Sequence, residues 1–298
     1  MMITYSFVIP HKNVPQLLER CIASIPERTD TEIIIVDDNS ENIKEIENKS
    51  FTYRKNLQFI KLNESKGAGY ARNLGITKAT GKWLLFADAD DFYTENLNLL
   101  LDKYKDDETN DVIYLNAQAI NEQGITTPLP IERYIRRYRN NKFYSEKVLR
   151  FENWVPWTRM VKKELVEKHD IKYEEIPVGN DAMFCLTCSK HAKNIDTELN
   201  VIYNYYKPSA GSCTFHYYNI KSFESRLYLC LRINKLYSQS GYAIKRSIIQ
   251  FKHSNKSFKQ EKEYNEICQR VLNENSHNVI IDIFNTAVSR MAKLLGIV

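Results

Sequence analysis

The chain has 298 residues, of which 43% are hydrophobic and 27% charged, a balance that excludes a disordered or fibrous protein. The formal net charge of +5 is uneven, because residues 207–298 carry 14 Lys and Arg against 6 Asp and Glu. This surplus indicates an acidic partner or a solvated helical surface. No stretch reaches the roughly 18 consecutive apolar residues of a membrane span, and the N-terminus lacks signal-peptide features. We therefore expect neither a signal peptide nor a spanning helix.

The six cysteines are scattered along the chain without the spacing of a disulfide framework. Cys185 and Cys188 form a CxxC pair, but no second pair or nearby histidine pair supplies the other ligands of a tetrahedral zinc. We therefore predict free thiols and a cytoplasmic location.

The first part of the chain alternates between strand and helix patterns. Short β-branched, nearly all-apolar runs such as 4–9 and 32–38 are typical of strands covered on both faces. Alternation at this interval predicts right-handed βαβ units, and so an α/β fold with a Rossmann-like, doubly wound, mostly parallel sheet. The predicted strands are 4–9, 32–38, 56–62, 82–88, 111–117 and 201–206, and the helices are 17–25, 67–79, 94–104 and 180–192.

The last part of the chain is basic and predicted to be helical, at 223–237, 242–253 and 278–296. We divide the chain into a nucleotide-binding and catalytic domain, 1–215, and a helical region, 216–298. The final segment has apolar residues from Ile280 to Leu295 at helical spacing, with Arg290 and Lys293 toward the other side. This amphipathic helix either packs on the helices before it or binds an anionic membrane surface.

Polar residues follow three of the predicted strands. Pro10 and Asn13 follow the first, Asp37 and Asp38 end the second, and an Asp-Ala-Asp-Asp run from Asp88 ends the fourth. Ligands bind beyond the carboxyl ends of such strands, and clustered carboxylates suit Mg²⁺ or Mn²⁺. The alternative is that these acids are solvated turns and helix caps, with Asp91 and Thr94 capping the helix after the fourth strand.

Three segments carry a family resemblance by their order and spacing: FVIPHKN, IIIVDDNS and SKGAGYARNLGITKATGKWLLFADADD. Together they closely resemble the family 2 glycosyltransferases with the A-type fold, strongly over residues 3–93 and weakly to about 215. The resemblance implies that one set of residues surrounds the nucleotide of a nucleotide-sugar donor. That set is Pro10, Asn13, Asp37, Asp38, Lys66, Arg72, Asp88 and Ala89, and Asp90 with Asp88 would hold the metal.

Individual side chains agree with these roles without requiring them. Asp37 can accept hydrogen bonds from a base or ribose, and Arg72 offers a planar fork to phosphate or base oxygens, unless it forms an ordinary surface ion pair. Lys66 can approach phosphates or be solvated. The neighbouring GAG is not a dinucleotide fingerprint and follows no predicted strand directly.

The resemblance extends to EEIPVGNDAMF, where these enzymes carry a Glu-Asp pair, and it maps the proton-accepting base onto Asp181. Asn180 replaces the preceding acid, which is a departure from the family pattern. By itself an Asp at a helix start is most simply a cap. Trp154 and Trp157 either stack on an acceptor sugar or belong to the core.

The resemblance therefore implies an inverting transfer of one sugar from a UDP-sugar to a glycan or lipid-linked acceptor, assisted by Mn²⁺ or Mg²⁺. We expect no nucleic-acid partner, and a cytoplasmic protein that can associate with the inner face of the membrane. Two alternatives remain: a nucleotidyltransferase, which would need a glycine-rich loop after the first strand, and a non-catalytic nucleotide-sugar-binding protein.

Overall fold

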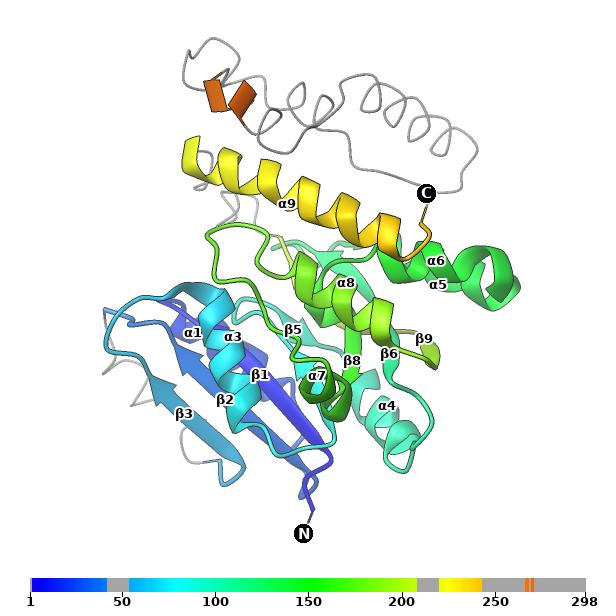
Figure 1. Ribbon diagram of the computed structural model, residues 1–298. Coiled ribbons are helices and arrows are strands. Elements are labelled where there is room, and N and C mark those ends of the chain that lie inside the picture. Colours follow the sequence, from blue (N-terminus) through cyan, green and yellow to red (C-terminus); the bar gives the residue numbers. More distant parts are fainter. Residues whose placement is uncertain (1, 42–53, 208–219, 243–265, 268, 271–298) are drawn as a thin grey trace.

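The structure, a computed structural model, describes residues 2–41, 54–207, 220–242, 266–267 and 269–270. Within these residues nine strands form one sheet with helices packed on it (Figure 1). The order across the sheet is β3-β2-β1-β4-β8-β6-β9-β5, and β7 pairs with β6. The strands are β1 (Tyr5–His11), β2 (Thr31–Asp37), β3 (Leu57–Lys61), β4 (Trp83–Phe86), β5 (Phe92–Tyr93), β6 (Val112–Ile120), β7 (Thr126–Pro128), β8 (Arg159–Lys162) and β9 (Ile195–Tyr206).

The first four strands in this order, β3-β2-β1-β4, are all parallel, which confirms the predicted α/β fold class. The antiparallel strand β8 then separates β4 from β6, and β6 pairs in parallel with β9. The sheet is therefore parallel on one side and mixed on the other. The carboxyl ends of β1 and β4 meet at one edge, since Val8 pairs with Phe86.

Helices cover the sheet and close its ends. They are α1 (Pro15–Ala23), α3 (Gly67–Lys78), α4 (Asn96–Tyr104), α5 (Pro130–Asn140), α6 (Lys142–Phe151), α7 (Lys163–Lys168), α8 (Ala182–His191) and α9 (Ile220–Gln239), with a short 3₁₀ turn η2 (Pro156–Thr158). Helix α3 packs so closely on β1 that a Cβ added to Gly75 would clash with Val8 Cγ1. This close packing brings Arg72, one turn earlier, near the end of β4.

Helix α9 lies across α8, away from the strands that begin the chain (Figure 1). The apolar residues Leu229 and Ile233 of α9 pack with Leu186 of α8 and Phe151 of α6 in a second buried cluster. The predicted helix at 223–237 therefore exists. The domain boundary at 215 and the predicted helices 242–253 and 278–296 lie outside the described residues, so that division stays a prediction.

Three further outcomes concern local predictions. Thr94 does not cap α4: the helix begins at Asn96, and the Thr94 hydroxyl donates instead to Val201 O at 2.5 Å. Cys21, Cys185 and Cys188 are buried and Cys230 is partly buried, and none of these four forms a disulfide. Among the described residues no helix is both long and apolar enough to cross a membrane.

Strand β8 was not predicted, because it begins with an arginine. Arg159 is fully buried, a position that a charged side chain occupies only with partners. Its guanidinium donates to Cys185 O at 2.7 Å, Ser189 Oγ at 3.0 Å and Asn153 O at 2.5 Å. Arg159 therefore joins β8 to α8 and to the loop before η2.

Candidate active site

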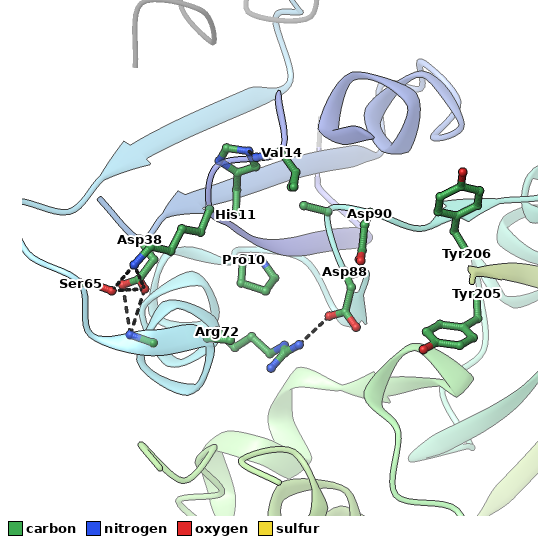
Figure 2. A pocket seen from close by; sticks show the side chains of 14 residues that line it. Pro10, His11, Val14, Asp38, Ser65, Arg72, Asp88, Asp90, Tyr205 and Tyr206 are labelled. Atoms are coloured by element: carbon green, nitrogen blue, oxygen red, sulfur yellow. Dashed lines mark hydrogen bonds and ion pairs between the residues drawn. The ribbon is translucent and has the colours of Figure 1, made fainter. Parts of the chain in front are cut away.

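A cavity of about 410 Å³ lies at the carboxyl ends of β1 and β4, bounded by the start of α3 and the end of β9 (Figure 2). We call it the strand-end cavity. In Figure 2, Asp38 and Ser65 lie at one end and Tyr205 and Tyr206 at the other, with Asp88 between them. Its lining residues are Pro10, His11, Lys12, Val14, Asp38, Ser65, Gly67, Ala68, Arg72, Asp88, Ala89, Asp90, Tyr205 and Tyr206.

Asp38 forms one end of this cavity and anchors the start of α3. Its carboxylate accepts from the backbone N–H of Lys66 at 2.6 Å and of Gly67 at 3.1 Å, and from Ser65 Oγ at 2.7 Å. A carboxylate at a helix N-terminus satisfies unpaired N–H groups and the positive end of the helix dipole. Lys66 itself points elsewhere: its Nζ lies 3.0 Å from Glu64 and it does not line the cavity.

Asp37, although adjacent to Asp38, lies behind the cavity and does not line it. It is fully buried and bonds to His11 Nδ1 at 2.7 Å, to Ser40 N at 2.9 Å and to Ser40 Oγ at 2.5 Å. Burial alone would raise the pKa of Asp37, but the hydrogen bonds from His11 and Ser40 outweigh it and lower the pKa. Asp37 therefore fixes His11, which does line the cavity.

Asn13 also lies outside the cavity lining. It adopts a left-handed backbone conformation, with φ of 56°, which Asn tolerates better than most residues. Its backbone N–H donates to Ser40 Oγ at 2.9 Å, and its side-chain Oδ1 accepts from Glu41 N at 2.9 Å. Asn13 therefore ties the loop after β1 to the loop after β2.

An ion pair between Arg72 and Asp88 crosses the floor of the cavity (Figure 2). Arg72 Nη2 lies 2.5 Å from Asp88 Oδ1, and Nη1 donates to Asn180 Oδ1 at 3.0 Å. The guanidinium also lies over the Tyr173 ring, 5.3 Å from its centroid. Arg72 is buried whereas the Asp88 side chain is 33% exposed, so the carboxylate faces the cavity with its other oxygen.

Asp90 and Asp91 follow Asp88 but have different surroundings. Asp90 lines the cavity, and burial together with the negative charge of Asp88 raises its pKa. Asp91 is fully buried and accepts from Tyr203 Oη at 2.8 Å and from Tyr206 N at 2.7 Å. The expectation that Asp91 caps α4 is therefore wrong: it joins the loop after β4 to β9.

Arg20 of α1 holds the same loop from the other side. Its Nη2 donates to the Asp90 carbonyl oxygen at 2.6 Å. Its guanidinium lies over both the Phe92 ring and the Tyr206 ring, 4.6 and 4.3 Å from their centroids. The peptide of Asp90 is thus fixed, while its side chain points into the cavity (Figure 2).

A second cavity, of about 480 Å³, adjoins the first and shares Asp88 and Tyr205 with it. We call it the tryptophan cavity, because Trp154 and Trp157 line it. Asp181 lies in its wall at the N-cap position of α8, but its side chain makes no capping hydrogen bond. Burial raises the pKa of Asp181, against the opposing effect of the Arg72 charge.

The acidic residues suit a divalent cation in kind. Asp88 and Asp90 offer hard carboxylate oxygens toward one cavity, the ligands that Mg²⁺ and Mn²⁺ prefer. The raised pKa of Asp90, caused by burial and then by Asp88, is the cost that a cation between them would relieve. Within the described part of the chain no group of three or more His, Cys, Asp or Glu could hold a metal alone. Donor phosphates and water would have to complete the coordination.

Several residues that line the strand-end cavity were not predicted from the sequence, among them His11, Lys12, Ser65, Tyr205 and Tyr206. His11 and Lys12 directly follow a predicted strand, so the strand-end rule could have found them. The two tyrosines come from β9, more than 110 residues after β4 in the chain. The pairing of β9 with both β5 and β6, and the hydrogen bonds of Asp91 to Tyr203 and Tyr206, bring them to the site.

The chain resembles known proteins in sequence and in fold. The model of glycosyl transferase family 2 matches residues 6–168, more than half of the chain. The chain belongs to this family. TarP of Staphylococcus aureus, a poly(ribitol-phosphate) β-N-acetylglucosaminyltransferase, is 26% identical over 212 residues, which cover 67% of this chain and 61% of TarP. The chain thus spans less than two thirds of this relative.

Two solved structures share the fold. The crystal structure of S. aureus TarS 1–349 in complex with UDP-GlcNAc has a TM-score of 0.67 at 17% identity, covering 92% of this chain and 80% of that one. The mannosyltransferase PcManGT from Pyrobaculum calidifontis, in complex with GDP-Man and Mn²⁺, has a TM-score of 0.54 at 14% identity, covering 98% and 81%.

The Asp37 network predicts an acid-dependent loss of stability. A carboxylate whose pKa is lower in the folded state stabilises the protein above its unfolded pKa of about 3.9 and loses this effect as the pH falls through the folded pKa. We expect Asp37→Asn to lower the free energy of unfolding by about 1–3 kcal/mol at neutral pH. The difference from the parent protein should shrink below about pH 4.

Urea titrations at neutral pH and below about pH 4 measure the free energy of unfolding of the parent protein and the variant. Asp106→Asn, at an exposed position, is the matched control. A difference that persists undiminished in acid would show that Asp37 does not act through its charge.

Proposed function

We propose that this chain transfers one sugar from a nucleotide sugar, a UDP-sugar, to a hydroxyl of a glycan or lipid-linked acceptor by a single inverting displacement. The observation that carries the proposal is the pair of adjoining cavities that share Asp88 and Tyr205. One has groups that suit a nucleoside diphosphate, and the other has a half-buried carboxylate, Asp181. Donor and acceptor can therefore meet at the shared wall.

The donor would lie in the strand-end cavity. Lys12 and Arg72 supply positive charge there. Pro10 and Asp38 form a wall against which a base and ribose can lie. The Arg72 guanidinium is already held by Asp88, so it is oriented before a ligand arrives. Fixed positive groups stabilise the negative charge that develops on a leaving diphosphate without reorganising during the reaction.

Mn²⁺ or Mg²⁺ would be held by Asp90 and Asp88 together with the donor phosphates. When bound, such an ion neutralises the leaving diphosphate and orients it. The chain's own contribution is to fix the loop that carries both carboxylates. Arg20 holds the Asp90 carbonyl, and Tyr203 donates to Asp91 while accepting from the Asp88 N–H at 3.0 Å.

Asp181 would accept the proton of the attacking hydroxyl. Its carboxylate is not used as a helix cap, although it occupies the N-cap position. The raised pKa makes Asp181 a stronger base than an exposed aspartate, as general-base catalysis near neutral pH requires. Attack from the acceptor side, opposite the leaving diphosphate, inverts the anomeric centre.

Donor binding tests both the proposal and the metal assignment. We expect UDP-GlcNAc with Mn²⁺ to raise the melting temperature of the protein, because a ligand that binds only the folded state stabilises it. Asp90→Ala should keep the fold and lose the part of this increase that depends on Mn²⁺. Asp106→Ala, at an exposed position, is the control. If no UDP-, TDP- or GDP-sugar raises the melting temperature, the proposed function is wrong.

The role of Asp181 predicts a separation of binding from turnover. Asp181→Asn is nearly isosteric and should leave donor affinity unchanged, while turnover falls on the order of 10²-fold or more. A matched control is Asp170→Asn, since Asp170 is exposed and lies outside both cavities. An equal loss of donor affinity in Asp181→Asn would instead mark Asp181 as structural. Turnover by the parent protein also separates an enzyme from a non-catalytic binding protein.

We also propose contact with an anionic membrane surface. Residues 130–151, which form α5 and α6, carry seven Lys and Arg against two Glu. In the first turn of α6, Phe143 and Tyr144 are 86% and 77% exposed. Exposed aromatic rings beside basic residues suit the interface of anionic lipids, to which each nearby Lys or Arg adds about 1 kcal/mol. The amphipathic segment from Ile280 lies outside the described residues.

Flotation with vesicles containing phosphatidylglycerol tests this surface. The parent protein should float at low salt, and the double variant Phe143→Ser with Tyr144→Ser should float less. Leu99→Ser, at another exposed apolar position on α4, should leave flotation unchanged. If the double variant floats like the parent while truncation after Ser276 abolishes flotation, the C-terminal segment is the membrane contact instead.

A further inference from the structure

The two cavities differ in charge. Lys12, Arg72 and His11 line the strand-end cavity beside its acids. In the tryptophan cavity the described lining residues include no Lys, Arg or His. Its charged groups are the carboxylates of Asp88, Glu152 and Asp181. A phosphate can therefore find a cationic partner in the first cavity but not among the described residues of the second.

The nearest cation does not change this contrast. Arg72 does not line the tryptophan cavity, and it directs one guanidinium nitrogen to Asp88 and another to Asn180. Burial raises the pKa of Asp181, which shows that the surroundings already disfavour negative charge at this point. The negative charge of Asp88 also raises the pKa of Asp181. A further anion on the acceptor would add to this electrostatic repulsion.

The remaining wall of the tryptophan cavity is aromatic and rigid. The Trp157 ring stacks on Tyr203 at 4.9 Å and on Tyr205 at 5.7 Å between centroids, with interplanar angles of 10° and 9°. The indole N–H of Trp154 donates to Phe151 O at 2.7 Å. Aromatic side chains present an apolar surface to the cavity. Together with Leu129, Pro130 and Ile131 at the start of α5, this surface suits the C–H face of a sugar ring.

We propose that the acceptor unit bound in the tryptophan cavity is a sugar ring that carries neither phosphate nor carboxylate. The aromatic wall binds the ring, and the carboxylates of Glu152 and Asp181 bind its hydroxyl groups while they repel anionic acceptors. This inference rests on the proposed function. TarP is named for a phosphate-bearing polymer, so the acceptor class assigned here differs from that of this relative.

Binding of matched sugars tests the acceptor class. Methyl glucoside, methyl galactoside and methyl N-acetylglucosaminide would each be compared with the corresponding 6-phosphate. Methyl glucoside would also be compared with methyl glucuronide, its 6-carboxylate analogue. Each is titrated into protein saturated with UDP and Mn²⁺, with tryptophan fluorescence as the readout. We expect an uncharged sugar to bind at least tenfold more tightly than its anionic counterpart. Equal or tighter binding of the anionic member, or no saturable binding by any uncharged sugar, overturns the inference.

A charge variant identifies the source of this preference. Glu152→Gln removes one carboxylate from the cavity wall and keeps an oxygen that can accept from Tyr242 Oη, as Glu152 does at 2.9 Å. It should narrow the preference for uncharged sugars severalfold. Glu132→Gln makes the same change of charge on α5, outside the cavity lining, and should leave the preference unchanged. An unchanged preference in Glu152→Gln contradicts the assigned electrostatic cause.

The failures of the two proposals can be told apart. Melting temperatures with UDP-sugars report on the donor site alone. If UDP-sugars bind and anionic acceptors bind as well as uncharged ones, only the acceptor class is wrong. If no nucleotide sugar binds, the proposed function fails, and the acceptor class fails with it.

Discussion

Three carboxylates within four residues at the end of β4 are the constraint on which the site depends. Charges this close repel each other strongly in a partly buried setting, so each needs its own compensation. Asp88 pairs with Arg72 of α3, and Asp91 accepts two hydrogen bonds from β9. Arg20 holds the carbonyl oxygen of Asp90, and burial and the charge of Asp88 raise the pKa of its side chain. These contacts fix the loop at several points. A cation beside Asp90 would stabilise its ionised carboxylate, which burial and Asp88 disfavour.

The hydrogen bonds that stabilise the Asp91 carboxylate also position the walls of the two cavities. Because Asp91 binds both Tyr203 and the backbone of Tyr206, the end of β9 is drawn against the loop after β4. Tyr205, between them, becomes the wall that both cavities share. Trp157 stacks on Tyr203 and Tyr205 and extends this wall toward Asp181. Asp91 lines neither cavity, but its hydrogen bonds to β9 position the wall that the two cavities share.

The sequence predicted well the parts that depend on local patterns. Apolar β-branched runs identify β1, β2 and β4, and the rule that ligands bind at strand ends locates the site. The same reasoning grouped Asp37 with Asp38, although successive strand side chains point to opposite faces and only Asp38 lines the cavity. That alternation was visible in the sequence. Tyr205 could not be predicted, because its place depends on pairing between distant strands.

Asn180 shows how one departure from the family pattern acts at this site. Its Oδ1 accepts from Arg72 Nη1 at 3.0 Å, so it makes the contact that a carboxylate would make there but adds no negative charge. The positive charge of Arg72 acts on both Asp88 and Asp181, and it opposes the rise in the Asp181 pKa that burial causes. A third carboxylate at position 180 would weaken that effect and raise the pKa of Asp181 further. The neutral side chain thus favours ionisation of Asp181, as the proposed role of proton acceptor requires, in a setting already crowded with acids.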